Sequence, residues 1–71
     1  MCKETGLELV KLLAERYEEV KRIRESLSKE TDKNEYRQRA GEMIGLDSAS
    51  RIIRDAVGIS FEEYIAATEH I

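Results

Sequence analysis

Proline and tryptophan are absent from this chain of 71 residues, and cysteine occurs once, at Cys2. A single cysteine cannot form a disulfide within the chain, which removes one common means of stabilising a small fold. This use of cysteine fits a reducing compartment. Without proline, the residues most apt to interrupt regular secondary structure are the four glycines, at positions 6, 41, 45 and 58. Helix ends are therefore expected first at these glycines.

Long apolar stretches are absent as well. No run approaches the roughly 18 residues that a membrane-spanning helix needs, and 38% of the residues are charged. The first six residues, Met-Cys-Lys-Glu-Thr-Gly, lack the basic and then apolar order of a signal peptide. The sequence therefore predicts a cytoplasmic protein with no membrane segment.

A basic tail is also missing, and the formal net charge is -3. Residues 58–71 carry three acidic side chains and neither lysine nor arginine. Proteins that bind nucleic acid without sequence preference rely on clustered basic residues. The composition thus gives little support to indiscriminate nucleic-acid binding.

The length of the chain predicts a single domain, residues 1–71, near the lower limit for a core that can stand alone. For a chain of this size the free energy gained by burying apolar surface and the entropy lost on ordering nearly cancel. Self-association is therefore expected to supplement folding, and a homodimer is the simplest form of it.

One amphipathic stretch, from Leu7 to Leu27, predicts a long helix within residues 1–30. Its apolar residues recur in alternating steps of three and four, which form one stripe along a helix. Leu9 and Ile23 widen this stripe, and Arg24 is its only polar member. We expect this stripe to form the homodimer interface through Val10, Leu13, Tyr17, Val20, Arg24 and Leu27.

Residues 31–71 predict a compact unit of three shorter helices. Asp32 and Glu35 have the spacing of a capping box at the start of a helix over residues 33–44, as do Thr5 and Glu8 at the start of the first helix. Gly45 is expected to end that helix in the left-handed conformation, and Asp47 to begin the next, over residues 47–57. Gly58 repeats the ending, and Ser60 with Glu63 repeats the capping box before a fourth helix.

Apolar spacing also predicts which side chains these three helices bury. The expected inner residues are Tyr36, Ala40, Met43 and Ile44 in the second helix, Ala49, Ile52, Ile53, Ala56 and Val57 in the third, and Phe61, Tyr64 and Ile65 in the fourth. The fold class is therefore all-α, a small helical domain whose long N-terminal amphipathic helix packs on two or three shorter helices.

The stretch 36–57 has the spacing of a helix-turn-helix, with the small Gly41 four residues before the turn at Gly45. Close crossing of two helices needs a small side chain in the first helix and a residue with positive φ in the turn. The stretch resembles the second helix-turn-helix of AraC-type transcription regulators, over about a third of the chain. The residues that carry the resemblance are Gly41, Glu42, Gly45, Leu46, Ser48, Ser50 and Arg54, followed by Gly58, Ser60 and Tyr64.

The resemblance implies a DNA-binding surface on the second and third helices. The chain departs from the family at three points. The family has about three more residues between the turn glycine and the glycine that is here Gly58, an aromatic residue in place of Ile52 and a proline in place of Phe61. An ordinary helical corner with solvated arginines is the alternative interpretation of the same residues. The residues that would face DNA are Arg37, Arg39, Ser48, Ser50, Arg51 and Arg54.

Two further features of the sequence bear on chemistry. The sequence Gly45-Leu46-Asp47-Ser48 is similar to the serine motif of acyl carrier proteins, but Asp47 and Ser48 are also ordinary residues for a helix start. His70 is the only histidine, and no serine has a base at a recognisable spacing. We therefore predict no catalytic, cofactor-binding or metal-binding residue.

These observations favour a non-enzymatic interaction module, a homo-oligomer that acts by binding a protein partner of unknown identity. The alternative is a small helix-turn-helix DNA-binding transcription regulator.

Overall fold

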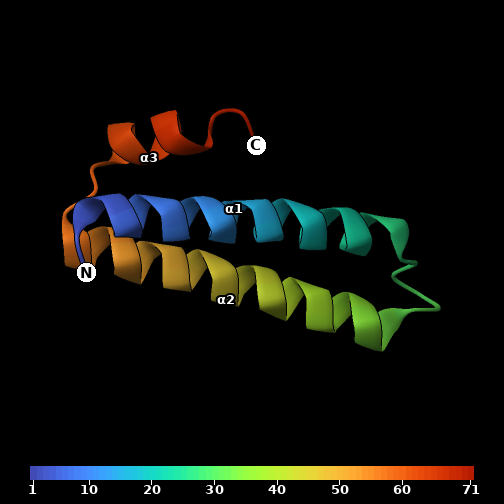
Figure 1. Cartoon of the computed structure of the whole chain (residues 1–71). Helices are drawn as coiled ribbons and strands as arrows, with labels where there is room; N and C mark the ends of the chain where they lie inside the picture. The colour runs from blue at the N-terminus through green and yellow to red at the C-terminus, as the bar shows by residue number, and fades with distance from the viewer.

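The computed structural model describes all residues, 1–71, and contains three helices and no strand. Helices α1 (Lys3–Ser26) and α2 (Lys33–Val57) form an antiparallel hairpin, and the short α3 (Phe61–Thr68) lies beside the N-terminal half of α1 (Figure 1). The predicted all-α class, with a long N-terminal amphipathic helix packed on the other helices, is confirmed. No helix combines the length and the apolar character needed to cross a membrane.

A pair of matching stripes joins α1 to α2. Each stripe alternates steps of three and four residues, the heptad spacing of a coiled coil. Every member is buried or half-buried, whereas most other residues are exposed. We call these stripes the seam; its members are Gly6, Val10, Leu13, Tyr17, Val20, Arg24 and Leu27 on α1, and Tyr36, Arg39, Met43, Leu46, Ser50, Ile53 and Val57 on α2.

Gly45 lies inside α2, so the predicted helix-turn-helix-like corner is absent and that prediction was wrong. Glycine inside a helix costs roughly 1 kcal/mol relative to alanine. A turn there would move the second half of α2 away from α1 and lose the seam contacts of Leu46, Ser50, Ile53 and Val57. The tertiary contacts therefore outweigh the local preference of glycine for a turn.

The continuous helix also changes which residues face inward. Ile52, expected in the core, is 68% exposed, and Ile44 is 69% exposed. Ala56 is exposed too. For Ile52 and Ala56 the expected period was counted from a new helix start at Asp47, whereas the real period runs unbroken from Tyr36. Ile44 directly follows the seam residue Met43 and so lies about 100° farther around the helix, away from α1. These three apolar residues consequently lie on the solvent side of α2.

Of the three expected capping boxes, only the one at Ser60 and Glu63 forms. The Glu63 backbone N–H donates to Ser60 Oγ (3.1 Å), and the Ser60 N–H donates to Glu63 Oε1 (3.0 Å). At α1 the helix begins at Lys3, ahead of Thr5. At α2 the Asp32 carboxylate instead accepts the Ser28 N–H (3.0 Å), which fixes the interhelical loop.

The end of α2 follows the sequence expectation. Gly58 has φ 73°, the left-handed conformation that glycine adopts without strain. The following Ile59 donates its N–H to the Arg54 carbonyl (2.9 Å), and its side chain is buried. This cap turns the chain back toward α1, where α3 begins.

Contacts at the edges of α3 hold it against the hairpin. Lys3 Nζ pairs with Glu63 Oε2 (2.6 Å), and the Arg54 guanidinium lies 4.1 Å from the centre of the Tyr64 ring. Tyr64 is half-buried as expected, but Phe61 and Ile65 are 68% and 45% exposed, so the prediction that they are buried was wrong. No residue of α3 is fully buried, so these polar contacts add to the half-buried packing of Tyr64 and Thr68.

Acid should therefore loosen α3 before the hairpin. Hydrogen bonding from Lys3 and from the Ser60 N–H lowers the pKa of Glu63 below its usual value of 4.5. A carboxyl whose pKa is lower in the folded state stabilises the fold above the unfolded pKa, and this contribution is lost as the pH falls through the folded value. We expect NMR amide signals of residues 61–68 to lose dispersion below about pH 4.5.

The matched variant for this titration is Glu63→Gln, which keeps the side-chain shape but carries no titrating charge. Its α3 signals should be weaker at neutral pH and should show no acid transition of their own. An acid transition of equal size in wild type and Glu63→Gln would contradict the assignment to Glu63.

Candidate functional site

A groove runs along the seam, on the side where α3 lies. A cavity of about 280 Å³ is lined by residues of α1, α2 and the C-terminal part of the chain, among them Leu13, Leu46 and Tyr64. A second cavity, of about 240 Å³, shares Tyr17 and Asp47 with the first. We call the two together the α1–α2 groove.

Only one end of the α1–α2 groove is covered. Tyr64, Thr68 and Ile71 line the first cavity, and no residue beyond α2 lines the second. The second cavity therefore forms the open half of the groove. Its lining residues are Tyr17, Arg24, Ala40, Met43, Ile44 and Asp47.

Arg24 marks the far end of this open half. Its guanidinium lies 5.6 Å from the centre of the Tyr36 ring, and Lys29 Nζ lies 5.9 Å from the same centre. No carboxylate of the chain pairs with Arg24, and its Nε is buried without a hydrogen-bond partner. Arg24 is only half-buried and lines the second cavity, so a carboxylate from another chain could pair with the terminal nitrogens of its guanidinium.

Three polar residues of the seam have a buried side-chain atom without a hydrogen-bond partner. The buried polar atoms without a partner are Arg24 Nε, Arg39 Nε and Ser50 Oγ, and all three belong to seam residues. Each such atom costs about 1–3 kcal/mol of desolvation. Polar residues in a coiled-coil seam lower the stability of the helix pair. They can in return specify its register or its partner.

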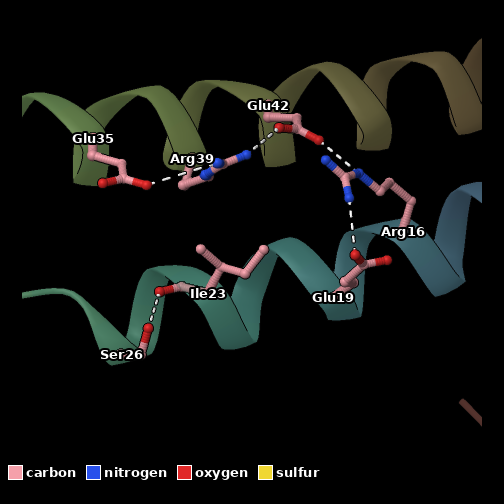
Figure 2. Close-up of polar contacts among 7 residues, drawn as sticks. All are labelled: Arg16, Glu19, Ile23, Ser26, Glu35, Arg39 and Glu42. Atoms are coloured by element: carbon pink, nitrogen blue, oxygen red, sulfur yellow. Dashed lines mark hydrogen bonds and ion pairs between the residues drawn. The ribbon is translucent and has the colours of Figure 1, made fainter.

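A network of ion pairs crosses the helix interface elsewhere. Glu42 of α2 accepts from Arg16 Nε of α1 (2.8 Å) and from Arg39 (3.2 Å), and it lies between these two arginines in Figure 2. Arg16 also pairs with Glu19 (3.1 Å) and Arg39 with Glu35 (3.7 Å). Because Glu19, Glu35 and Glu42 are all paired, the network leaves no unpaired carboxylate for ligand binding within it.

The α1 stripe predicted as a homodimer interface is largely occupied within the chain. Val10 and Val20 have no exposed surface, and the other four predicted residues, Leu13, Tyr17, Arg24 and Leu27, are half-buried. The reason is the length of α2, which is long enough to cover the whole of α1. Leu13, Tyr17 and Arg24 instead line the α1–α2 groove.

The six residues expected to face DNA do not share one surface. Ser50 is buried, Arg39 belongs to the ion-pair network, and the Arg54 side chain lies on Tyr64 and donates to the Ser50 carbonyl (3.4 Å). The exposed Arg51 pairs with Asp47 (3.2 Å). Only Arg37 and Ser48 are both exposed and unpaired.

No group of three or more histidine, cysteine or acidic side chains converges anywhere in the structure. Ser48, the residue similar to the carrier-protein serine, lies in the middle of α2 and not at a helix start. Comparison of the chain with known protein families, curated proteins and solved structures finds no match.

The sequence analysis did not predict that four residues of the open half of the groove belong to a site: Ala40, Met43, Ile44 and Asp47. It assigned the first three to a closed core and Asp47 to a helix start. The signal that could have found them is the heptad spacing of Tyr36, Met43, Ser50 and Val57, which continues across Gly45.

Proposed function

We propose that this chain is a non-enzymatic interaction module, a homo-oligomer that acts by binding a protein partner in the α1–α2 groove. The observation that carries the proposal is the open half of the groove, which combines Tyr17, Ala40 and Ile44 with an arginine that forms no ion pair in the chain. A surface of this kind fits an amphipathic helix, the common ligand of grooves between helices.

The chemistry of the groove indicates what the partner helix carries. Apolar side chains would pack on Tyr17, Ala40 and Ile44, and a carboxylate would reach the Arg24 guanidinium. Charge-assisted hydrogen bonds of this type are roughly twice as strong as neutral ones. A cytoplasmic location, where Cys2 stays reduced, belongs to the same proposal.

Affinity capture from the native host tests the proposal with two variants. Arg24→Glu changes the open half of the groove, and Arg22→Glu introduces the same charge at an exposed position of α1 that does not line it. We expect at least one protein to be retained by wild type and Arg22→Glu and lost with Arg24→Glu, and the purified protein should bind with one-to-one stoichiometry. Identical captured proteins for both variants would contradict a binding role for the groove.

A further inference from the structure

The solvent side of α2 carries an apolar surface that nothing in the chain covers. Ile44 and Ile52 are 69% and 68% exposed, and they lie two turns apart on the same side of the helix. Small residues, Gly41, Gly45, Ser48 and Ala56, surround them and are exposed as well. A β-carbon added to Gly41 or Gly45 would meet no atom within 4 Å. We call these six residues the outer face of α2.

Two charged residues lie at opposite ends of this face. Arg37 precedes it and Asp55 falls within its last turn, and both point to the same side of the helix because they are 18 residues, five turns, apart. Both are exposed, and neither forms an ion pair in the chain, although Arg16, Arg39 and Arg51 all do. Because the two ends carry opposite charges, the face is complementary to the same face of a second copy that runs antiparallel to it.

We propose that a second copy of this chain binds the outer face of α2, with the two α2 helices antiparallel and the two-fold axis beside Ser48. This inference assigns a surface to the homo-oligomer of the proposed function. In this register Ile44 of each copy lies opposite Ile52 of the other. The small side chains of Gly41, Gly45 and Ser48 allow the two backbones to approach closely.

The same register pairs the charges. Asp55 lies opposite Gly41 of the second copy, and Arg37 is one turn from Gly41, about 6 Å along the helix. An arginine side chain spans that distance, so each copy gives one Arg37 to Asp55 contact and the dimer has two. A parallel arrangement would instead place Arg37 beside Arg37 and Asp55 beside Asp55.

The hairpin exposes more surface than a compact monomer of its mass, which leaves area for a second copy to cover. The accessible surface is 5022 Å², whereas a compact monomer of this mass exposes about 4,500 Å². Stable dimers bury about 800 Å² per subunit. The 25-residue α2 offers one continuous face for this contact, and the chain by itself buries only 6 of its 71 residues.

Sedimentation equilibrium at micromolar concentration tests the surface with a matched pair of variants. Wild type should have twice the 8.2 kDa mass of the chain. Ile52→Glu should raise the dimer dissociation constant more than about tenfold. Leu12→Glu, at a position that is 60% exposed on α1, should leave the dissociation constant unchanged. Circular dichroism should show both variants folded, because neither residue is in the seam.

Charge reversal tests the antiparallel register. Arg37→Glu and Asp55→Arg should each weaken the dimer several-fold, and the double variant should restore it. On a Cys2→Ser background, Ser48→Cys should oxidise to a covalent dimer, whereas Glu15→Cys should not.

The outcomes separate this inference from the proposed function. A wild-type mass of 8.2 kDa would overturn self-association itself. A dimer that is indifferent to Ile52→Glu would overturn the outer face but not the homo-oligomer. Failure of the charge reversal or of the Ser48 cross-link would overturn the register. Ile44 belongs to both surfaces, so partner binding in the α1–α2 groove is measured with Arg24→Glu, which changes a groove residue that is not part of the outer face.

Discussion

Replacing Val20 by aspartate is expected to unfold the protein at room temperature. Val20 is one of two large side chains with no exposed surface. Losing its burial costs about 1.5–3 kcal/mol, and leaving an unpaired charge in the same place costs about 3–5 kcal/mol more. The sum approaches the whole stability of a domain of this length, roughly 4–11 kcal/mol. The helical signal at 222 nm should therefore be largely lost.

The matched control is Leu12→Asp, which adds the same charge to an exposed position of the same helix. Surface substitutions of this kind change stability by about 0.5 kcal/mol or less. Thermal melting followed by circular dichroism should show a cooperative transition for Leu12→Asp and none for Val20→Asp. A cooperative melt of Val20→Asp near the wild-type temperature would mean that the seam is not the core of the hairpin.

Adding one methyl group at Gly6 is expected to destabilise the protein, although alanine is the better helix former. A β-carbon at Gly6 would lie 2.6 Å from Val57 Cγ2, closer than any stable contact. The valine side chain has little freedom to move away, because its β-branch restricts χ1 in a helix. Overpacking of this kind costs about 1–3 kcal/mol, against a gain of about 1 kcal/mol from helix propensity.

Two comparisons isolate the contact with Val57. Gly41→Ala adds the same methyl group where no atom lies within 4 Å, so it should stabilise the helix by about 0.5–1 kcal/mol. On a Val57→Ala background the clash is gone, and Gly6→Ala should become stabilising. Urea denaturation measures the free energy of unfolding of the three single variants and of the Gly6→Ala/Val57→Ala double variant. The protein concentration is kept below that at which the chain self-associates. The same sign for Gly6→Ala in both backgrounds would contradict the close approach of α1 and α2 at this layer.

Features that depend on a few neighbouring residues were predictable. Gly58 ends α2 in the left-handed conformation and Ser60 begins α3 with a capping box, as the sequence indicated. The start of α2 at Lys33 was also expected, although Asp32 bonds within the loop and does not cap the helix. These features are set by backbone sterics and hydrogen bonds within a few residues, which distant parts of the chain do not change.

The candidate site was predicted less well. Arg24 was identified as the exceptional residue of the α1 stripe, and it does lie at the end of the open half of the groove. The α2 side of the groove was missed, because Arg39 and Ser50 interrupt its apolar spacing and conceal a seam that is continuous in space. Whether a stripe faces its own chain or another chain cannot be derived from its period alone.

Gly45 separates what the sequence by itself determined from what only the tertiary structure decided. The sequence determined an all-α chain, an amphipathic N-terminal helix, and the end of α2 at Gly58. It also gave Gly45 and Gly58 the same local preference for a turn, yet only Gly58 adopts a positive φ. Packing of α2 along the full length of α1 decided the difference, because a turn at Gly45 would give up the seam beyond it for a local gain of about 1 kcal/mol. That same continuity turned Ile52 and Ala56 to the side of α2 where Ile44 is exposed, and so completed the face proposed to bind a second copy.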